Sequence, residues 1–156
     1  MDDKTNVIRI LDKQKIKYNC YKYDNSKAYS GTEVAKMIGK SNEIVFKTLV
    51  LTSKSKKNYV FVIPVEKTLD LKKAAKTVGE KHVEMLLMKD LLPLTGYVHG
   101  GCSPIGMKKF FKTVIDESAK KFESIIFSAG RIGMQVELQL KDLEKIIKIE
   151  YCDVVE

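Results

Sequence analysis

The sequence has no tryptophan, only two histidines and three prolines, and no apolar run of membrane-spanning length. Two histidines are too few for a metal centre made of several imidazoles, and there is no CxxC pair, P-loop, GxSxG or HExxH motif. The three cysteines, Cys20, Cys102 and Cys152, are odd in number, which argues against a disulfide framework and for reduced thiols. No metal ion or other cofactor is therefore expected.

What the sequence does have is the length of one domain and an excess of lysine. Its 156 residues, 44% hydrophobic and 31% charged, are typical of a globular protein, and the absence of repeats and linkers predicts a single domain over 1–156. The N-terminus lacks the features of a signal peptide, so a cytoplasmic location is expected. The sequence has 28 Lys and Arg against 20 Asp and Glu. This positive charge favours a polyanionic partner such as nucleic acid. Alternatively, the lysines only make the surface soluble.

Apolar periodicity and turn residues predict helices interleaved with strands. The expected helices cover 4–14, 33–37 with Thr32 as N-cap, 71–79 with Asp70 as N-cap, 88–95 and 140–147. The expected strands cover 17–23, 43–52, 58–65, 81–86, 112–117, 124–128, 134–138 and 149–155, with a hairpin turn at 53–58. This order predicts an α/β or α+β fold with a mixed sheet.

One cation interrupts the most apolar of these strands, EIVFKTLVL at 43–51. Alternate residues of a strand share a face, and here both faces are apolar, so Lys47 carries its ammonium on an apolar face of a central strand. Removing a charge from water costs several kcal/mol unless it is paired or lines a cavity. The Lys47 ammonium therefore either reaches solvent or pairs with a core carboxylate, or it places a positive charge at the floor of a pocket.

The stretch GYVHGGCSPIGMKK at 96–109 predicts a loop. Its glycines allow the backbone either to adopt positive φ or to come very close to another group. Exposed N–H groups in such a loop form a nest for a carboxylate, phosphate or oxyanion, although a plain turn has the same composition. Lys108 and Lys109 beside it favour a phosphate partner. Cys102 lies three residues after His99, and the two could look like a thiol nucleophile with its general base. Residues of a glycine-rich loop rarely hold the geometry that such a pair needs. A further glycine-bearing bend at 127–133 is read as a hairpin.

Together, VFKTLVL, LKKAAKTVG, GYVHGGCSPIGMKK, IDESA and IFSAGRIGMQVEL resemble the YbaK/EbsC family of aminoacyl-tRNA deacylases, in order and with similar spacing from about 23 to 143. The resemblance implies a mixed α/β fold around a partly closed, barrel-like sheet, similar to the editing insertion domain of bacterial prolyl-tRNA synthetase. It implies a free-standing editing factor that acts on the acceptor end of aminoacyl-tRNA, with prolyl-tRNA synthetase as a possible associate. In the family's cysteine-specific members the thiol of the substrate is thought to attack its own ester, whereas others remove alanine with a positioned water.

The resemblance also assigns site residues. The family's essential lysine corresponds to Lys47, and its GxxxP loop to the span from Gly100 to Pro104. It implies that Lys47 anchors the terminal ribose or the ester, and that N–H groups around Gly100 and Gly101 fix the substrate carbonyl and terminal adenosine. The further pocket positions that it implies are Tyr23, Thr48, Cys102, Ser103, Pro104 and Ser128.

Two positions depart from the family pattern. Gln135 stands where many relatives have an acid, and His99 where a nonpolar or basic residue is common. Substrate-thiol-assisted removal of cysteine from tRNA(Pro) is the leading hypothesis. Alanine removal with water, and a silent tRNA-binding or synthetase-binding module, are the alternatives. Attachment to a membrane surface is disfavoured because no strongly basic amphipathic helix occurs.

Overall fold

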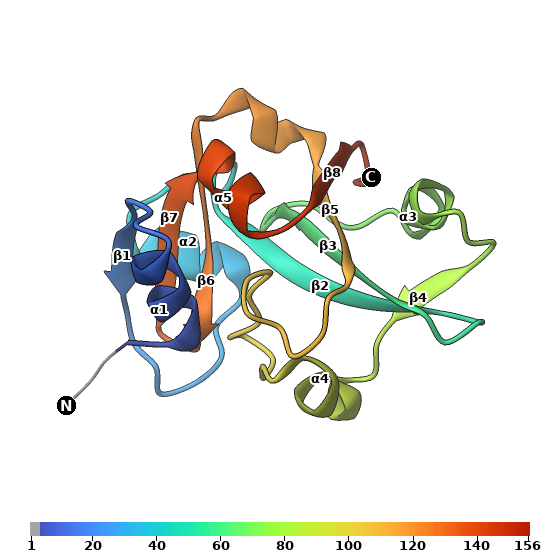
Figure 1. Ribbon diagram of the computed structural model, residues 1–156, viewed down its shortest axis with the longest axis horizontal. Coiled ribbons are helices and arrows are strands. Elements are labelled where there is room, and N and C mark those ends of the chain that lie inside the picture. The colour runs from blue at the N-terminus through green and yellow to red at the C-terminus, as the bar shows by residue number, and fades with distance from the viewer. Residues whose placement is uncertain (1–3) are drawn as a thin grey trace.

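The computed structural model describes residues 4–156, in which helices and strands alternate (Figure 1). The helices are α1 (Asn6–Lys13), α2 (Gly31–Met37), α3 (Leu71–Val78), α4 (Met88–Thr95), α5 (Leu140–Ile146) and the 3-10 helix η1 (Glu117–Lys121). The strands are β1 (Asn19–Lys22), β2 (Phe46–Ser53), β3 (Asn58–Pro64), β4 (Val83–Met85), β5 (Lys112–Asp116), β6 (Ser124–Arg131), β7 (Met134–Gln139) and β8 (Ile149–Cys152). Every helix and strand expected from the sequence is present in the expected order, whereas η1 was not predicted.

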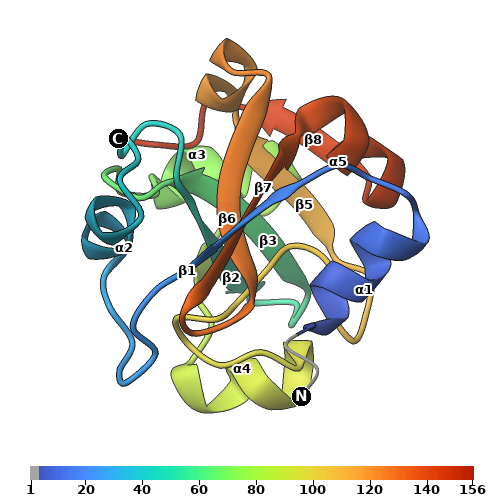
Figure 2. The same cartoon turned by 90° about the vertical axis from the view of Figure 1, so that its left-hand side faces the viewer.

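The strands form two sheets. The larger has the order β4-β2-β3-β5-β8, with β3, β5 and β8 parallel, and the smaller is antiparallel with the order β1-β7-β6. Figure 2 shows the smaller sheet in front of the larger one. This confirms a mixed α+β fold. The strands do not, however, close into one barrel: the sheets meet at a single bridge between Val45 and Ile126.

The main hydrophobic core fills the space between the two sheets and includes Phe46, Ile115 and Phe127, all nearly inaccessible to solvent. A second core, with Leu51 and Phe61, packs the opposite face of the larger sheet against α3. Strand β2 therefore has apolar contacts on both faces, as its sequence predicts.

The cap of α2 differs from the expectation. Ser30 rather than Thr32 is the N-cap: its hydroxyl accepts a hydrogen bond from the Glu33 N–H at 3.3 Å, and the Glu33 carboxylate accepts one from the Ser30 N–H at 3.0 Å. This capping box needs a glutamate three residues after the cap, which Ser30 has and Thr32 lacks. Ser30, and not Thr32, therefore marks the start of α2.

Candidate functional site

Strand β2 has an open edge along its first half. Its pairing with β4 begins only at Leu51, and the last hydrogen bond on that side runs from the Leu86 N–H to the Val50 carbonyl at 3.0 Å. At the other end, the Ile44 carbonyl accepts from the Ile126 N–H at 3.0 Å. Between these two bonds, backbone groups alternate between β3 and the open side. The N–H and C=O of Thr48 share the direction of Ile44 and Val50, so they point to the open side.

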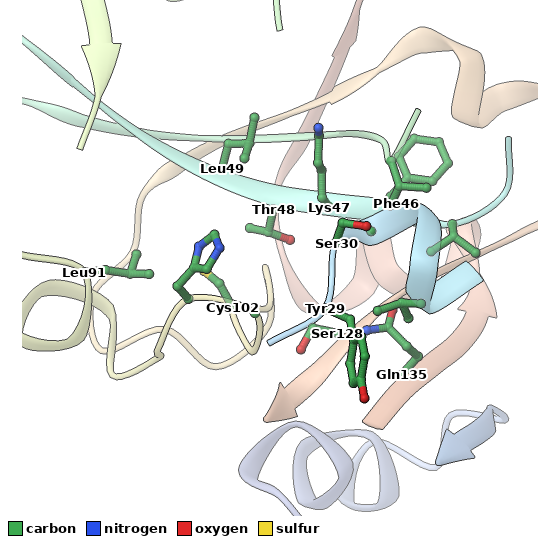
Figure 3. A pocket seen from close by; sticks show the side chains of 16 residues that line it. Tyr29, Ser30, Phe46, Lys47, Thr48, Leu49, Leu91, Cys102, Ser128 and Gln135 are labelled. Carbon is green, nitrogen blue, oxygen red and sulfur yellow. The ribbon is translucent and has the colours of Figure 1, made fainter. Parts of the chain in front are cut away.

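A pocket of about 340 Å³ lies along this open edge (Figure 3). It gathers residues from the entrance of α2, from β2 and α4, from the glycine-rich loop and from the β6–β7 hairpin. Its lining comprises Tyr29, Ser30, Gly31, Val34, Val45, Phe46, Lys47, Thr48, Leu49, Val65, Leu91, His99, Gly100, Cys102, Ser128 and Gln135.

Lys47 is half-buried at this edge, and within residues 4–156 no carboxylate pairs with it. The core carboxylate that would have explained it structurally is absent from that part of the chain. Burial lowers the pKa of the Lys47 ammonium from its ordinary value, because desolvation disfavours the charged form. An unpaired cation beside a cavity is a strong electrostatic feature for a polar ligand.

Thr48 lies on the other side of the strand, as Figure 3 shows, together with Ser128 and Gln135. The Thr48 hydroxyl is buried and has no hydrogen-bond partner in the described chain. Ser128 accepts from the Gly130 N–H at 3.1 Å, and the Gln135 amide donates to the Tyr23 hydroxyl at 3.3 Å. The pocket thus has a polar wall in which the Thr48 hydroxyl has no hydrogen bond within the described chain. A buried unpaired polar group costs free energy, so a ligand that pairs with this hydroxyl would recover that cost.

The glycine-rich loop enters the pocket through a tight turn. The Gly101 N–H donates to the Val98 carbonyl at 3.0 Å, and Gly100, third residue of that turn, has φ +88°. This is the left-handed position that a type II turn reserves for glycine. A Cβ on Gly100 would lie 3.0 Å from the Ala28 Cβ, so the loop also approaches the segment before α2 closely.

Gly101 has a different place from the one the resemblance implies. It does not line the pocket, its N–H is engaged in the turn, and its Cα packs against the Arg131 backbone, 3.0 Å from where a Cβ would stand. Gly100, in contrast, lines the pocket, and its N–H has no partner among the described residues. Of these two glycines, Gly100 is the one that leaves its N–H free for a ligand.

The rest of the loop divides in the same way. Cys102 lines the pocket, whereas Ser103 is fully buried with its hydroxyl accepting from the Ile105 N–H at 3.3 Å, and Pro104 borders another hollow. Burial raises the pKa of the Cys102 thiol to about 12, so the thiol stays neutral near pH 7. No hydrogen bond joins it to His99 in the described chain, and the arrangement is not that of a thiol nucleophile with its base.

Five residues named from the sequence thus line the pocket: Lys47, Thr48, Gly100, Cys102 and Ser128. Tyr23 touches it only through Gln135. His99 and Gln135, whose roles the sequence left open, both belong to the lining.

Sequence reasoning missed the lining residues from α2 and α4. The Ser30–Glu33 capping box was a usable signal for Ser30, because it places the helix start. Leu91 had no such signal, since its position depends on how α4 packs beside the loop. Within residues 4–156 no three His, Cys, Asp or Glu side chains gather to hold a metal ion, and no helix is long and apolar enough to cross a membrane.

A sequence model of the family described as aminoacyl-tRNA editing domain matches residues 25–146, and the chain belongs to this family. The resemblance found in the sequence is thereby confirmed.

Among its relatives is the EbsC protein of Enterococcus faecalis, named as a candidate Cys-tRNA(Pro)/Cys-tRNA(Cys) deacylase. The two chains are 42% identical over 152 residues, which is 97% of this chain and 93% of the relative. The uncharacterised protein YwhH of Bacillus subtilis is 27% identical over 113 residues, 72% of this chain and 71% of the relative.

Solved structures show the same fold. A candidate trans-editing enzyme for prolyl-tRNA synthetase superimposes with a TM-score of 0.84 at 20% identity, covering 100% of this chain and 99% of that one. The hypothetical protein APE2540 superimposes with a TM-score of 0.86 at 22% identity, covering 97% of this chain and 100% of that one.

Proposed function

We propose that the protein removes misattached amino acids from tRNA, with cysteinyl-tRNA(Pro) as its main substrate, by cleaving the ester between the amino acid and the terminal ribose. The observation that carries the proposal is Lys47 at the open edge of β2, unpaired within the described residues, with the unpartnered hydroxyl of Thr48 on the opposite face of the same strand. Membership of the editing family and the 42% identity to EbsC support it.

The lining of the pocket suits a reaction that needs positioning more than a protein base. The Lys47 ammonium stabilises negative charge on the ester or ribose oxygens, and the Gly100 N–H donates to the substrate carbonyl. The Thr48 N–H, C=O and hydroxyl supply hydrogen bonds along the strand edge. Among the described residues no carboxylate lines the pocket, and the Cys102 thiol is neutral near pH 7.

With a cysteinyl substrate, the reaction needs no added nucleophile. The substrate sulfur bonds to its own carbonyl carbon, the bond from that carbon to the ribose oxygen breaks, and the thiol proton passes to the ribose oxygen. The products are a cyclic thiolactone and free tRNA. Holding sulfur and carbonyl in reach of each other is itself a large part of such catalysis.

A second candidate is removal of alanine by a water molecule. The observation that favours it is His99, which lines the pocket and carries an imidazole able to orient water. Alanine has no thiol, so this route requires that water, and the small pocket would exclude larger side chains.

The deciding experiment compares cysteinyl-tRNA(Pro) with alanyl-tRNA(Pro), using the native chain and a Lys47→Met variant. Release from the cysteinyl substrate alone, lost in the variant, supports the thiol-assisted route. Preferential release of alanine moves the protein to the water route. Binding of tRNA with neither release shows a silent binding module and overturns the proposal.

Substitution of Cys102 by alanine provides a separate check on the nucleophile. Because the thiol is buried and protonated, Cys102→Ala is expected to leave the rate of deacylation largely unchanged. Single-turnover deacylation at pH 7 measures this. A loss as large as that of the Lys47 variant would mean that the thiol of the protein takes part in the reaction.

The partner in this scheme is the acceptor end of aminoacyl-tRNA. We also propose that the protein works in the cytoplasm and that it associates with prolyl-tRNA synthetase. The structural neighbour at TM-score 0.84, a candidate trans-editing enzyme for that synthetase, supports the association. Co-sedimentation of the chain with the synthetase, with and without tRNA, tests the association.

A further inference from the structure

An aromatic side chain stands exposed outside the pocket. Phe110 is 73% exposed, more than any other large hydrophobic residue in the described chain. It borders two hollows of about 230 and 270 Å³, formed with Thr113 between the end of the glycine-rich loop and the segment after α5. A single exposed ring is normal on a protein surface, so the charges around Phe110 decide whether it marks a contact site.

Four lysines surround this ring. Lys108 and Lys109 line the first hollow and Lys112 and Lys148 the second. Lys112 pairs with Glu150 at 3.5 Å, but no carboxylate in residues 4–156 pairs with Lys108, Lys109 or Lys148. We call Phe110 with these four lysines the Phe110 surface. Its charge is positive and largely uncompensated.

The Phe110 surface is tied to the wall of the pocket through α4. The Lys108 N–H donates to the Thr95 carbonyl at 3.1 Å, and the Lys108 side chain runs beside Gly96, where a Cβ would be 3.4 Å from its Cγ. Leu91, one turn earlier in α4, lines the pocket. The stretch from Leu91 to Thr95 spans about 6 Å along the helix axis, at about 1.5 Å per residue. A chain of a few nucleotides leaving the pocket can therefore reach Lys108, along the loop that joins α4 to β5 (Figure 1).

Single-stranded nucleic acid is the ligand that this combination fits. Lysines bind its phosphates, and an exposed aromatic ring stacks on an unpaired base. A membrane surface would be met by a broad apolar helix face rather than by one ring among lysines. We propose that the Phe110 surface binds the unpaired nucleotides and first phosphates of the tRNA acceptor end, outside the pocket that takes the aminoacyl group. The inference rests on the proposed function, whose substrate it extends.

Two variants test this: Phe110→Ala, and the double variant Lys108→Glu with Lys109→Glu. Each has a matched control far from the surface, Leu71→Ala in α3, whose side chain is 41% exposed, and Lys54→Glu with Lys57→Glu in the exposed β2–β3 turn. The measurement is the Kd of uncharged tRNA(Pro) at several salt concentrations. Phe110→Ala is expected to raise Kd about fivefold to a hundredfold, the usual effect of losing one stacking contact. The double lysine variant is expected to raise Kd and to reduce the slope of log Kd against log salt by about 1.4 to 1.8. The controls are expected to change Kd by less than about twofold.

Kinetics separate this inference from the proposed function. On cysteinyl-tRNA(Pro) the variants are expected to raise KM with little change in kcat. With a cysteinyl ester of adenosine, which is too short to reach Phe110, they are expected to match the native chain. Tight tRNA binding that depends on the Phe110 surface, without any deacylation, would overturn the proposed function and keep the surface. Deacylation with Kd and KM unchanged in both variants would overturn the surface and keep the function.

Discussion

Lys47→Met is expected to lower kcat/KM for deacylation at least about 100-fold, the usual effect of losing one oxyanion-stabilising group. Methionine keeps the length and apolar stem of lysine but has no charge, so it fills the same space beside β2. The ammonium is unpaired in the described chain, so its loss leaves no buried carboxylate behind. Single-turnover deacylation measures the effect. An unchanged rate would remove Lys47 from the reaction.

The same substitution is expected to stabilise the fold, raising Tm by about 1–3 °C. Burial lowers the pKa of Lys47 below its ordinary 10.5, so in the pH range just below 10.5 the unfolded chain binds more protons than the folded one. The contribution of Lys47 to stability therefore rises as pH increases through that range. Calorimetry should find the advantage of the methionine variant smaller at pH 10 than at pH 7. A lower Tm for Lys47→Met at pH 7 would contradict a desolvated, unpaired cation.

The lowered pKa also predicts the pH dependence of activity. If the ammonium is the active form, enzymatic deacylation decreases as pH rises through a pKa below 10.5. The decrease is measured after subtracting spontaneous hydrolysis of the ester, which is the rate seen without protein.

Gly100→Ala is expected to have the second largest effect, lowering kcat/KM at least about tenfold. An alanine at φ +88° costs about 1–2 kcal/mol, and its Cβ would press on Ala28 at 3.0 Å. The turn would relax by moving the Gly100 N–H, which is the donor that the loop offers to the substrate carbonyl. The measurement is kcat/KM on cysteinyl-tRNA(Pro), together with Tm.

Gly79→Ala is the matched control for this variant. Gly79 ends α3 with φ +74°, and a Cβ there meets nothing within 4 Å, so alanine carries the backbone cost alone. Both variants are expected to have a lower Tm. Only Gly100→Ala is expected to have a lower kcat/KM, because only Gly100 lies in the pocket. Equal activity losses in the two variants would mean that reduced stability, and not the turn, causes them.

The sequence could pose the question of Lys47, because a cation within an apolar strand is visible in the pattern. It could not show the open edge beside it. That edge exists because the pairing of β4 with β2 begins at Leu51 and β6 meets this chain segment at the bridge of Val45 with Ile126. Strand pairing between distant segments leaves no local signal. Thr48 was therefore predicted as a pocket residue from resemblance alone, while its unpaired backbone became apparent only in the structure.

The glycine-rich loop shows the same limit. Its composition predicts a close approach of the backbone, and the structure has one at Gly100 and another at Gly101. Which glycine faces the pocket depends on the turn type, and which packs on the β6–β7 hairpin depends on tertiary contacts. Composition cannot separate these roles. The resemblance places Ser103 and Pro104 in the pocket as well, whereas in the structure neither residue belongs to its lining.

The fold class followed from the order of the elements, but the division into two sheets did not. Alternating apolar residues predict that a strand is buried, whereas the choice of neighbour depends on packing across the whole domain. In one continuous, partly closed sheet, β2 and β6 would pair along their length near Val45. In the structure they share an isolated bridge between Val45 and Ile126, which does not join the two sheets into one.

The open edge of β2 has one more consequence. Unpaired strand edges invite a second polypeptide to add itself, which is a common route to aggregation. Here the gap is bounded by the bonds of Ile44 and Val50, so the edge lacks a neighbouring strand only from Phe46 to Leu49, and residues of α2, α4 and the glycine-rich loop line the pocket beside it. A small ester with one or two hydrogen-bonding groups can take the position of a missing strand, whereas a protein strand is too long to enter. Inhibitors of this pocket can be designed accordingly, as short strand mimics whose single amide pairs with the backbone of Thr48.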